Sequence, residues 1–171
     1  GQIDLAIIGG QLPGDLENLL QVIPYATDEL ALVLPSKHPL SNKKELLKED
    51  LYKLNFVTLD SQSTTRKVVD KLLKDSGLDI QRLKIEMELN SLEAIKNAVQ
   101  SGLGASFLPV VSIERELAAG TIHKAFIADL EVKRELKLIT NPSRYTSRAS
   151  EVFKKNILPQ FASFESPLRE S

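Results

Sequence analysis

Apolar and polar residues are arranged along this chain in blocks that predict strands and helices in turn. Residues 3–8 are apolar at nearly every position, which is typical of a strand covered on both faces in a parallel sheet. Residues 83–89 and 131–140 instead alternate apolar with charged side chains, as half-exposed strands do. Four further apolar runs predict strands at 20–25, 30–34, 56–59 and 104–109.

Helical periodicity is clearest in residues 64–76, where an apolar stripe precedes Gly77, a residue suited to a C-terminal cap. A second helix follows the strand at 83–89. We expect Asn90 rather than Ser91 to cap it, because Glu93 then stands at the third helical position of a capping box. Further helices are expected from a Ser112 cap to residue 119, over 147–157 and, as a short one, within 42–54. Strands alternating with helices predict an α/β fold built from βαβ units.

Composition limits the possible classes of function. A chain of 171 residues suits one domain, or two small lobes that share a cleft. Its 22 basic and 23 acidic residues give a formal net charge of -1, which argues against nucleic-acid binding by this chain alone, because such binding needs a concentrated positive surface. The sequence has no cysteine, so thiol chemistry is excluded, and no apolar run is long enough to cross a bilayer.

The most suggestive local pattern is a polar turn between the strand at 56–59 and the helix at 64–76. Free N–H groups, hydroxyls and the positive end of the helix dipole together favour an anion at such a position, and an arginine there can clamp a carboxylate or phosphate. The alternative interpretation is simple helix capping beside an exposed arginine. The candidate residues are Ser61, Gln62, Ser63, Thr64, Thr65 and Arg66.

Two other strand ends are candidates for the same ligand, because ligands of open α/β sheets gather outside the carboxyl ends of the strands. Gly9 and Gly10 end the first strand, and Asn90 follows the strand at 83–89.

Catalytic interpretations of the sequence are weak. The two histidines, His38 and His123, have no partners in a recognisable spacing, and no metal-ligand or nucleophile–base pattern is present. We therefore expect neither an enzyme nor a cofactor or metal site.

Three segments in this order, GQIDLAIIGG, LVLPSKHPL and NSLEAIKNAVQSGLGASFLP, resemble the effector-binding region of LysR-type transcriptional regulators. The stretch LDSQSTTRKVVDKLL is similar to the subgroup that regulates carbon-fixation (RuBisCO-operon) and inorganic-carbon genes in cyanobacteria and plastids. The resemblance implies two Rossmann-like lobes with a cleft between them, like type-2 periplasmic binding proteins. Lobe I would hold residues 1–38 and 134–171, and lobe II residues 39–133.

The resemblance also implies a function. An effector would bind at Ser61–Arg66 and Gly9–Gly10, with Phe107 lining the hinge side. The effectors of such relatives are small anionic metabolites such as 2-oxoglutarate, 2-phosphoglycolate, ribulose bisphosphate or NADPH. We expect a homodimer or homotetramer in the cytoplasm or plastid stroma, with no membrane contact. DNA would be contacted only through an N-terminal domain that precedes this sequence. Lobe I would be incomplete here, because its first strands and helices would also precede this sequence. The alternative is a periplasmic-type solute-binding protein.

Overall fold

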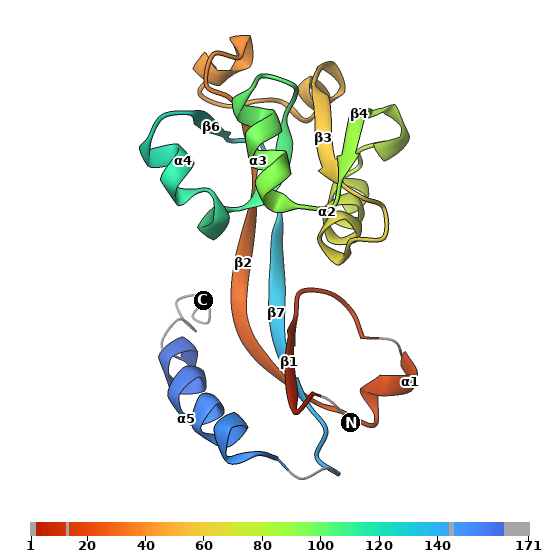
Figure 1. Ribbon diagram of the computed structural model, residues 1–171. Coiled ribbons are helices and arrows are strands. Elements are labelled where there is room, and N and C mark those ends of the chain that lie inside the picture. Colours follow the sequence, from red (N-terminus) through yellow and green to blue (C-terminus); the bar gives the residue numbers. More distant parts are fainter. Residues whose placement is uncertain (1–2, 13, 144–145, 163–171) are drawn as a thin grey trace, which may run out of the picture. The chain divides into compact units, whose positions relative to one another are not determined.

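The computed structural model describes residues 3–12, 14–143 and 146–162, and it divides into two compact units (Figure 1). Unit 1 holds the described residues up to Thr27 and from Glu135 onward, and unit 2 runs from Asp28 to Arg134. The chain therefore passes from one unit to the other at residues 27–28 and again at residues 134–135. These passages occur within two strands, β2 (Gln21–Pro35) and β7 (Lys133–Thr140), which are neighbours in one sheet.

Unit 1 contains strand β1 (Leu5–Ile8) and helices α1 (Gly14–Glu17) and α5 (Arg148–Ala162). The expectation of a parallel sheet for the first strand is wrong, because β1 pairs antiparallel with β7, Leu5 opposite Thr140 and Ile8 opposite Lys137. Its Ile7 side chain is 40% exposed, so the strand is not covered on both faces. A continuous apolar run does not encode the direction of the partner strand.

Strand β2 is one continuous element, whereas the sequence pattern predicted two strands, at 20–25 and 30–34. The polar segment at 26–29 contains neither glycine nor proline, so nothing in it forces the backbone out of an extended conformation. Within unit 2, β2 pairs antiparallel with both β5 (Ser106–Pro109) and β6 (Ile122–Ala125). Both faces of β2 are covered by apolar clusters there, so Leu30 to Leu34 are buried without a break.

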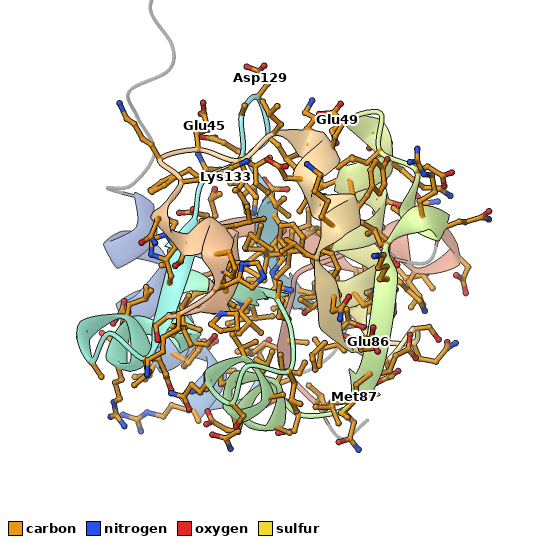
Figure 2. All side chains as sticks on the ribbon, turned by 90° about the horizontal axis from the view of Figure 1, so that it is seen from above. Glu45, Glu49, Glu86, Met87, Asp129 and Lys133 are labelled. Atoms are coloured by element: carbon orange, nitrogen blue, oxygen red, sulfur yellow. The ribbon has the colours of Figure 1, made fainter. Side chains whose placement is uncertain are left out.

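The predicted βαβ unit is confirmed in unit 2 (Figure 1). Strand β3 (Asn55–Leu59) is followed by helix α2 (Thr64–Asp75) and then by β4 (Lys84–Leu89), which pairs parallel with β3. Gly77 takes a φ of 90° after α2, as expected for the glycine that ends a helix. Met87 is exposed on β4, and Figure 2 shows Glu86 and Met87 together on this strand.

Two helix caps differ from the expectation. Helix α3 (Leu92–Gln100) is capped by Ser91, whose hydroxyl accepts a hydrogen bond from Ala94 N at 3.5 Å, and not by Asn90. Helix α4 (Glu114–Ala118) begins later than predicted because Ser112 belongs to a 3-10 turn, where its hydroxyl donates to Pro109 O at 2.7 Å. Local hydroxyl-to-backbone bonds compete in this way with capping. The remaining 3-10 helices span Pro39–Asn42, Lys48–Lys53 and Ile80–Arg82.

The core of unit 2 lies on both sides of β2. Leu30, Leu32 and Leu34 face a cluster that includes Phe56 and Phe107, whereas Ala31 and Val33 face a second cluster with the apolar side of α3. Alternate residues of a strand point to opposite faces, so a strand covered twice is apolar at every position. Residues of β3, α2 and β5 pack together with Leu30, Leu32 and Leu34 on one face of β2, and the candidate site lies at the start of α2.

Candidate functional site

The turn after β3 presents an uncapped helix start. Asp60 holds the turn: its carbonyl accepts from Ser63 N at 3.0 Å and its carboxylate accepts from Gln62 N at 2.9 Å. Ser63 is the N-cap of α2, but within the described part of the chain no side chain bonds to the first helical amides. The N–H groups of the first turn therefore point outward at the positive end of the helix dipole, an arrangement that suits an anion.

The second predicted strand end lies beside the first. Asp60 N donates to Leu89 O at 3.0 Å, so the carboxyl ends of β3 and β4 are adjacent, as a parallel pair requires. Asn90 follows directly and is exposed. Gly9 and Gly10 lie in a bend after β1, in unit 1. Their part in ligand binding, like that of Asn90, stays a prediction.

The guanidinium of Arg66 is already engaged. Its Nε lies 2.8 and 2.9 Å from the two carboxylate oxygens of Asp70, and its Nη1 contacts the Thr58 hydroxyl, Leu59 O at 3.3 Å and Glu88 at 3.4 Å. Only 15% of the side chain is exposed. These contacts join α2 to β3 and β4. Two carboxylates beside one guanidinium leave a net negative charge, so Arg66 would have to exchange partners before it could clamp an anion. Its predicted role as a clamp stays a prediction.

A second arginine, which the sequence pattern did not single out, reaches the same helix start. Arg134 Nη1 donates to the Thr65 hydroxyl oxygen at 2.7 Å. Its Nε and Nη2 donate to one carboxylate oxygen of Asp28 at 2.9 and 2.7 Å. The side chains of Arg134 and Asp28 are 15% and 8% exposed, so the pair is largely shielded from water.

A mainly apolar pocket of about 30 Å³, which has room for a water molecule but not for a metabolite, is lined by residues of β3, α2, β4 and β5. It brings together three of the predicted residues, Thr65, Arg66 and Phe107, and Phe107 stacks on Phe56 with ring centroids 6.2 Å apart. Ser106 also lines the pocket and was not predicted. The other predicted residues of the turn, at 61–64, are absent from the pocket lining and lie on the segment that leads to Thr65.

A second pocket of unit 2 is acidic. Four carboxylates line it together with one ammonium group, that of Lys124, which pairs with Glu29 at 2.6 Å. Asp129, one of the four, stands at the tip of a loop and Glu45 lies near it (Figure 2). The other carboxylate is Glu131, which pairs with Lys133 at 2.6 Å. The negative charges of these carboxylates repel an anion, so the acidic pocket suits an anionic ligand less well than the start of α2 does.

Neither histidine forms part of a recognisable site. His38 Nδ1 accepts from Leu40 N at 3.1 Å and so caps a 3-10 helix, and His123 lies in β6. Within residues 3–12, 14–143 and 146–162, no group of three His, Cys, Asp or Glu side chains is placed to hold a metal ion. No helix of the described segments is long and apolar enough to cross a membrane.

Comparison with models of protein families shows which family the chain belongs to. The family model of the LysR substrate binding domain matches residues 1–162. The chain belongs to this family. The α/β fold expected for LysR regulatory domains, of the type-2 periplasmic-binding-protein kind, is thereby confirmed.

Curated relatives with more than half of the matched residues identical carry one name. The chain is 58% identical over 162 residues to the probable RuBisCO transcriptional regulator of Synechocystis sp. strain PCC 6803, covering 95% of this chain and 47% of that protein. It is 57% identical over 161 residues to the regulator of the same name from Porphyra purpurea, covering 94% of this chain and 51% of that protein. The chain thus spans about half the length of the curated relatives it matches. These relatives are named as regulators of transcription, not as enzymes.

Solved LysR structures share the fold at lower identity. The regulatory domain of Synechocystis PCC6803 CcmR, in complex with 2-PG, superposes with a TM-score of 0.81 at 24% identity and covers 94% of this chain and 74% of its own. The effector-binding domain of QuiR, in complex with shikimate, superposes with a TM-score of 0.78 at 23% identity and covers 95% and 73%.

Proposed function

We propose that this chain is the effector-sensing domain of a LysR-type transcription factor that controls carbon-fixation genes, and that it binds a small anionic metabolite at the start of α2. The observation that carries the proposal is the uncapped helix start at Thr64–Arg66, where the N-cap residue Ser63 makes no side-chain cap hydrogen bond. Outward amides, hydroxyls and a helix dipole are the groups that recognise a phosphate or carboxylate.

Relatives support the regulatory part of this proposal. Those with 58% and 57% identity are named probable RuBisCO transcriptional regulators. The solved neighbours are described with 2-PG and shikimate, and both 2-phosphoglycolate and shikimate are small carboxylate anions. A periplasmic-type solute-binding protein is the less favoured alternative, because regulators and their domains account for these matches.

The remaining expectations belong to the same proposal. Lobe I would comprise residues 1–38 and 134–171 and lobe II residues 39–133, with Gly9 and Gly10 as the lobe I part of the effector site. The protein would act as a homodimer or homotetramer in the cytoplasm or plastid stroma and contact DNA through a separate domain. A switch of this kind requires the effector to bind one conformation better than another.

Isothermal titration calorimetry tests the proposal on the whole product of the gene. The probes are 2-phosphoglycolate, 2-oxoglutarate, ribulose bisphosphate and shikimate. We expect at least one anion to bind, and replacement of Thr64 and Thr65 together by valine to weaken its binding about tenfold or more, since two hydroxyl donors are lost. The control variant is Thr121→Val, which removes an exposed hydroxyl before β6 and should bind unchanged. Absence of binding by every probe, or equal binding by the double valine variant, contradicts the proposal.

A further inference from the structure

An ion pair stands at the two places where the chain leaves unit 2. Asp28 is the first residue of this unit and Arg134 is the last. Two residues further into the unit, Leu30 N donates to Val132 O at 2.8 Å. The backbone of β2 is therefore also bonded to the segment that leads into β7. Because two guanidinium N–H groups share one oxygen of Asp28 in a largely buried setting, the pair fixes the position of the Arg134 side chain.

The third bond of this guanidinium goes to the candidate anion site. Arg134 Nη1 donates to the Thr65 oxygen at 2.7 Å. A hydroxyl has one hydrogen and can accept as well as donate, so a Thr65 oxygen that accepts from Arg134 turns its own hydrogen toward another acceptor. A bond from a charged donor also polarises the hydroxyl and makes it a stronger donor.

Arg134 differs from Arg66 in its surroundings. Arg66 is shared between Asp70 and Glu88, whereas Arg134 has one carboxylate partner, Asp28, and one neutral partner, Thr65. The charge of Arg134 is thus balanced by Asp28, and its contribution at the helix start passes through the Thr65 hydroxyl rather than through a free positive charge.

We propose that Arg134 is a positioning residue for the anion site: held by Asp28, it orients the Thr65 hydroxyl so that this group donates to the bound anion. The inference rests on the proposed function. It adds a positioning residue to that site, anchored where β2 and β7 carry the chain out of unit 2.

A double-mutant cycle in anion binding tests the inference. Calorimetry on the whole gene product compares the unmodified protein, Arg134→Gln, Thr65→Val and the combination of both, with 2-phosphoglycolate as the probe or, if another anion of the panel binds more tightly, with that anion. We expect each single replacement to weaken binding about tenfold, and the combination to be no weaker than either single variant within about threefold. Arg134→Lys should restore part of the affinity, because an ammonium group can still donate to the hydroxyl.

Lys133→Gln is the matched control. It removes the same charge one residue away, from an exposed side chain that pairs with Glu131 and does not contact Thr65, and its affinity should stay within about twofold. Arg134→Gln leaves the Asp28 carboxylate without its partner, so a second variant, Asp28→Asn with Arg134→Gln, removes both charges together. It should show the same loss of affinity and the same lack of additivity with Thr65→Val, with its fold checked by circular dichroism.

The outcomes separate the two proposals. If the unmodified protein binds no anion, the proposed function fails and this inference fails with it. If it binds, and Thr65→Val weakens binding while the Arg134 variants do not, only this inference is overturned. A combined loss of about a hundredfold, the product of the single losses, also overturns it, because Arg134 would then act independently of the Thr65 hydroxyl.

Discussion

The carboxylate of Asp50 provides a direct test of how one buried charge stabilises unit 2. Its side chain is 3% exposed and accepts from Lys53 at 2.7 Å, from Leu47 N at 3.1 Å and from Lys43 at 3.1 Å. Lys53, the Leu47 amide and Lys43 together hold the pKa of Asp50 at about 2, below its ordinary value of 3.8. We expect Asp50→Asn, which keeps the shape but loses the charge, to unfold more easily than the unmodified protein.

The size of the effect follows from the pKa. A tenfold change in proton affinity corresponds to about 1.4 kcal/mol, so the lowering of this pKa corresponds to at most about 2.4 kcal/mol of folding free energy. Water screens both lysine partners, which are 48% and 69% exposed. We therefore expect Asp50→Asn to lower the free energy of unfolding by about 1–2 kcal/mol at pH 7.

The dependence on pH gives the prediction its sign. A carboxyl group whose pKa is depressed in the folded protein contributes its full stabilisation above its unfolded value of 3.8 and loses it as the pH falls toward about 2. Urea denaturation followed by circular dichroism should show the full difference between the two proteins at pH 5–7 and about half of it at pH 3.

Asp75→Asn is the control for this prediction. Asp75 pairs with Lys71 on the surface of α2, where both side chains are more than half exposed, and its replacement should change the free energy of unfolding by less than about 0.5 kcal/mol. The reasoning is refuted if Asp50→Asn is as stable as the unmodified protein at pH 7, or if the difference does not shrink on acidification.

Three further predictions concern unit 2, each measured as the free energy of unfolding in urea. Gly104→Ala should destabilise by about 1–3 kcal/mol, because the added Cβ would lie 2.6 Å from Asn55 O, whereas Gly14→Ala meets nothing within 4 Å. Ser91→Ala should cost about 0.5–1 kcal/mol and Asn90→Ala less, since Ser91 caps α3. Lys96→Met should destabilise the protein because it leaves Glu116 without its partner at 2.9 Å, and adding Glu116→Leu should recover much of the loss.

The results that contradict these three predictions are distinct. Equal stability of the Gly104 and Gly14 variants would mean that the backbone beside β3 adapts to a side chain. A larger effect of Asn90→Ala than of Ser91→Ala would restore the capping box expected from the sequence. An additive loss for Lys96→Met and Glu116→Leu would show that the two side chains do not stabilise each other.

The βαβ part of the fold was predictable because each of its elements carries its own signal. The period of α2, the glycine at 77 and the alternation of β4 are local features that the structure keeps. The direction of β1 and the continuity of β2 were not predictable from local pattern, because both depend on partner strands that lie far away in the sequence. Ser91 rather than Asn90 caps α3 because Ser91 is the last extended residue before the helix, with φ -134° and ψ 130°, and residue type alone does not determine that position.

The candidate site was predicted in part. The helix start at Thr64 was expected from the pattern, whereas the partners of Arg66 could not be, because Asp70 and Glu88 are two of many carboxylates in the sequence. Arg134 had a signal that the sequence analysis missed. Arg134 lies in β7 two residues from Leu136 and two residues after the buried Val132, and Asp28 lies in β2 two residues before the buried Leu30, so opposite charges alternate with apolar residues on two neighbouring strands.

The central claim, that an anion binds at the start of α2, is tested most directly by hydrogen–deuterium exchange with mass spectrometry on the whole gene product. The first-turn amides of α2 have no acceptor within the helix and exchange quickly when no ligand is bound. Saturation with the tightest-binding anion of the panel should slow exchange most strongly in peptides that contain residues 60–67. Slower exchange confined to peptides of the acidic pocket, at residues 124–132, with no change at residues 60–67, would contradict the account.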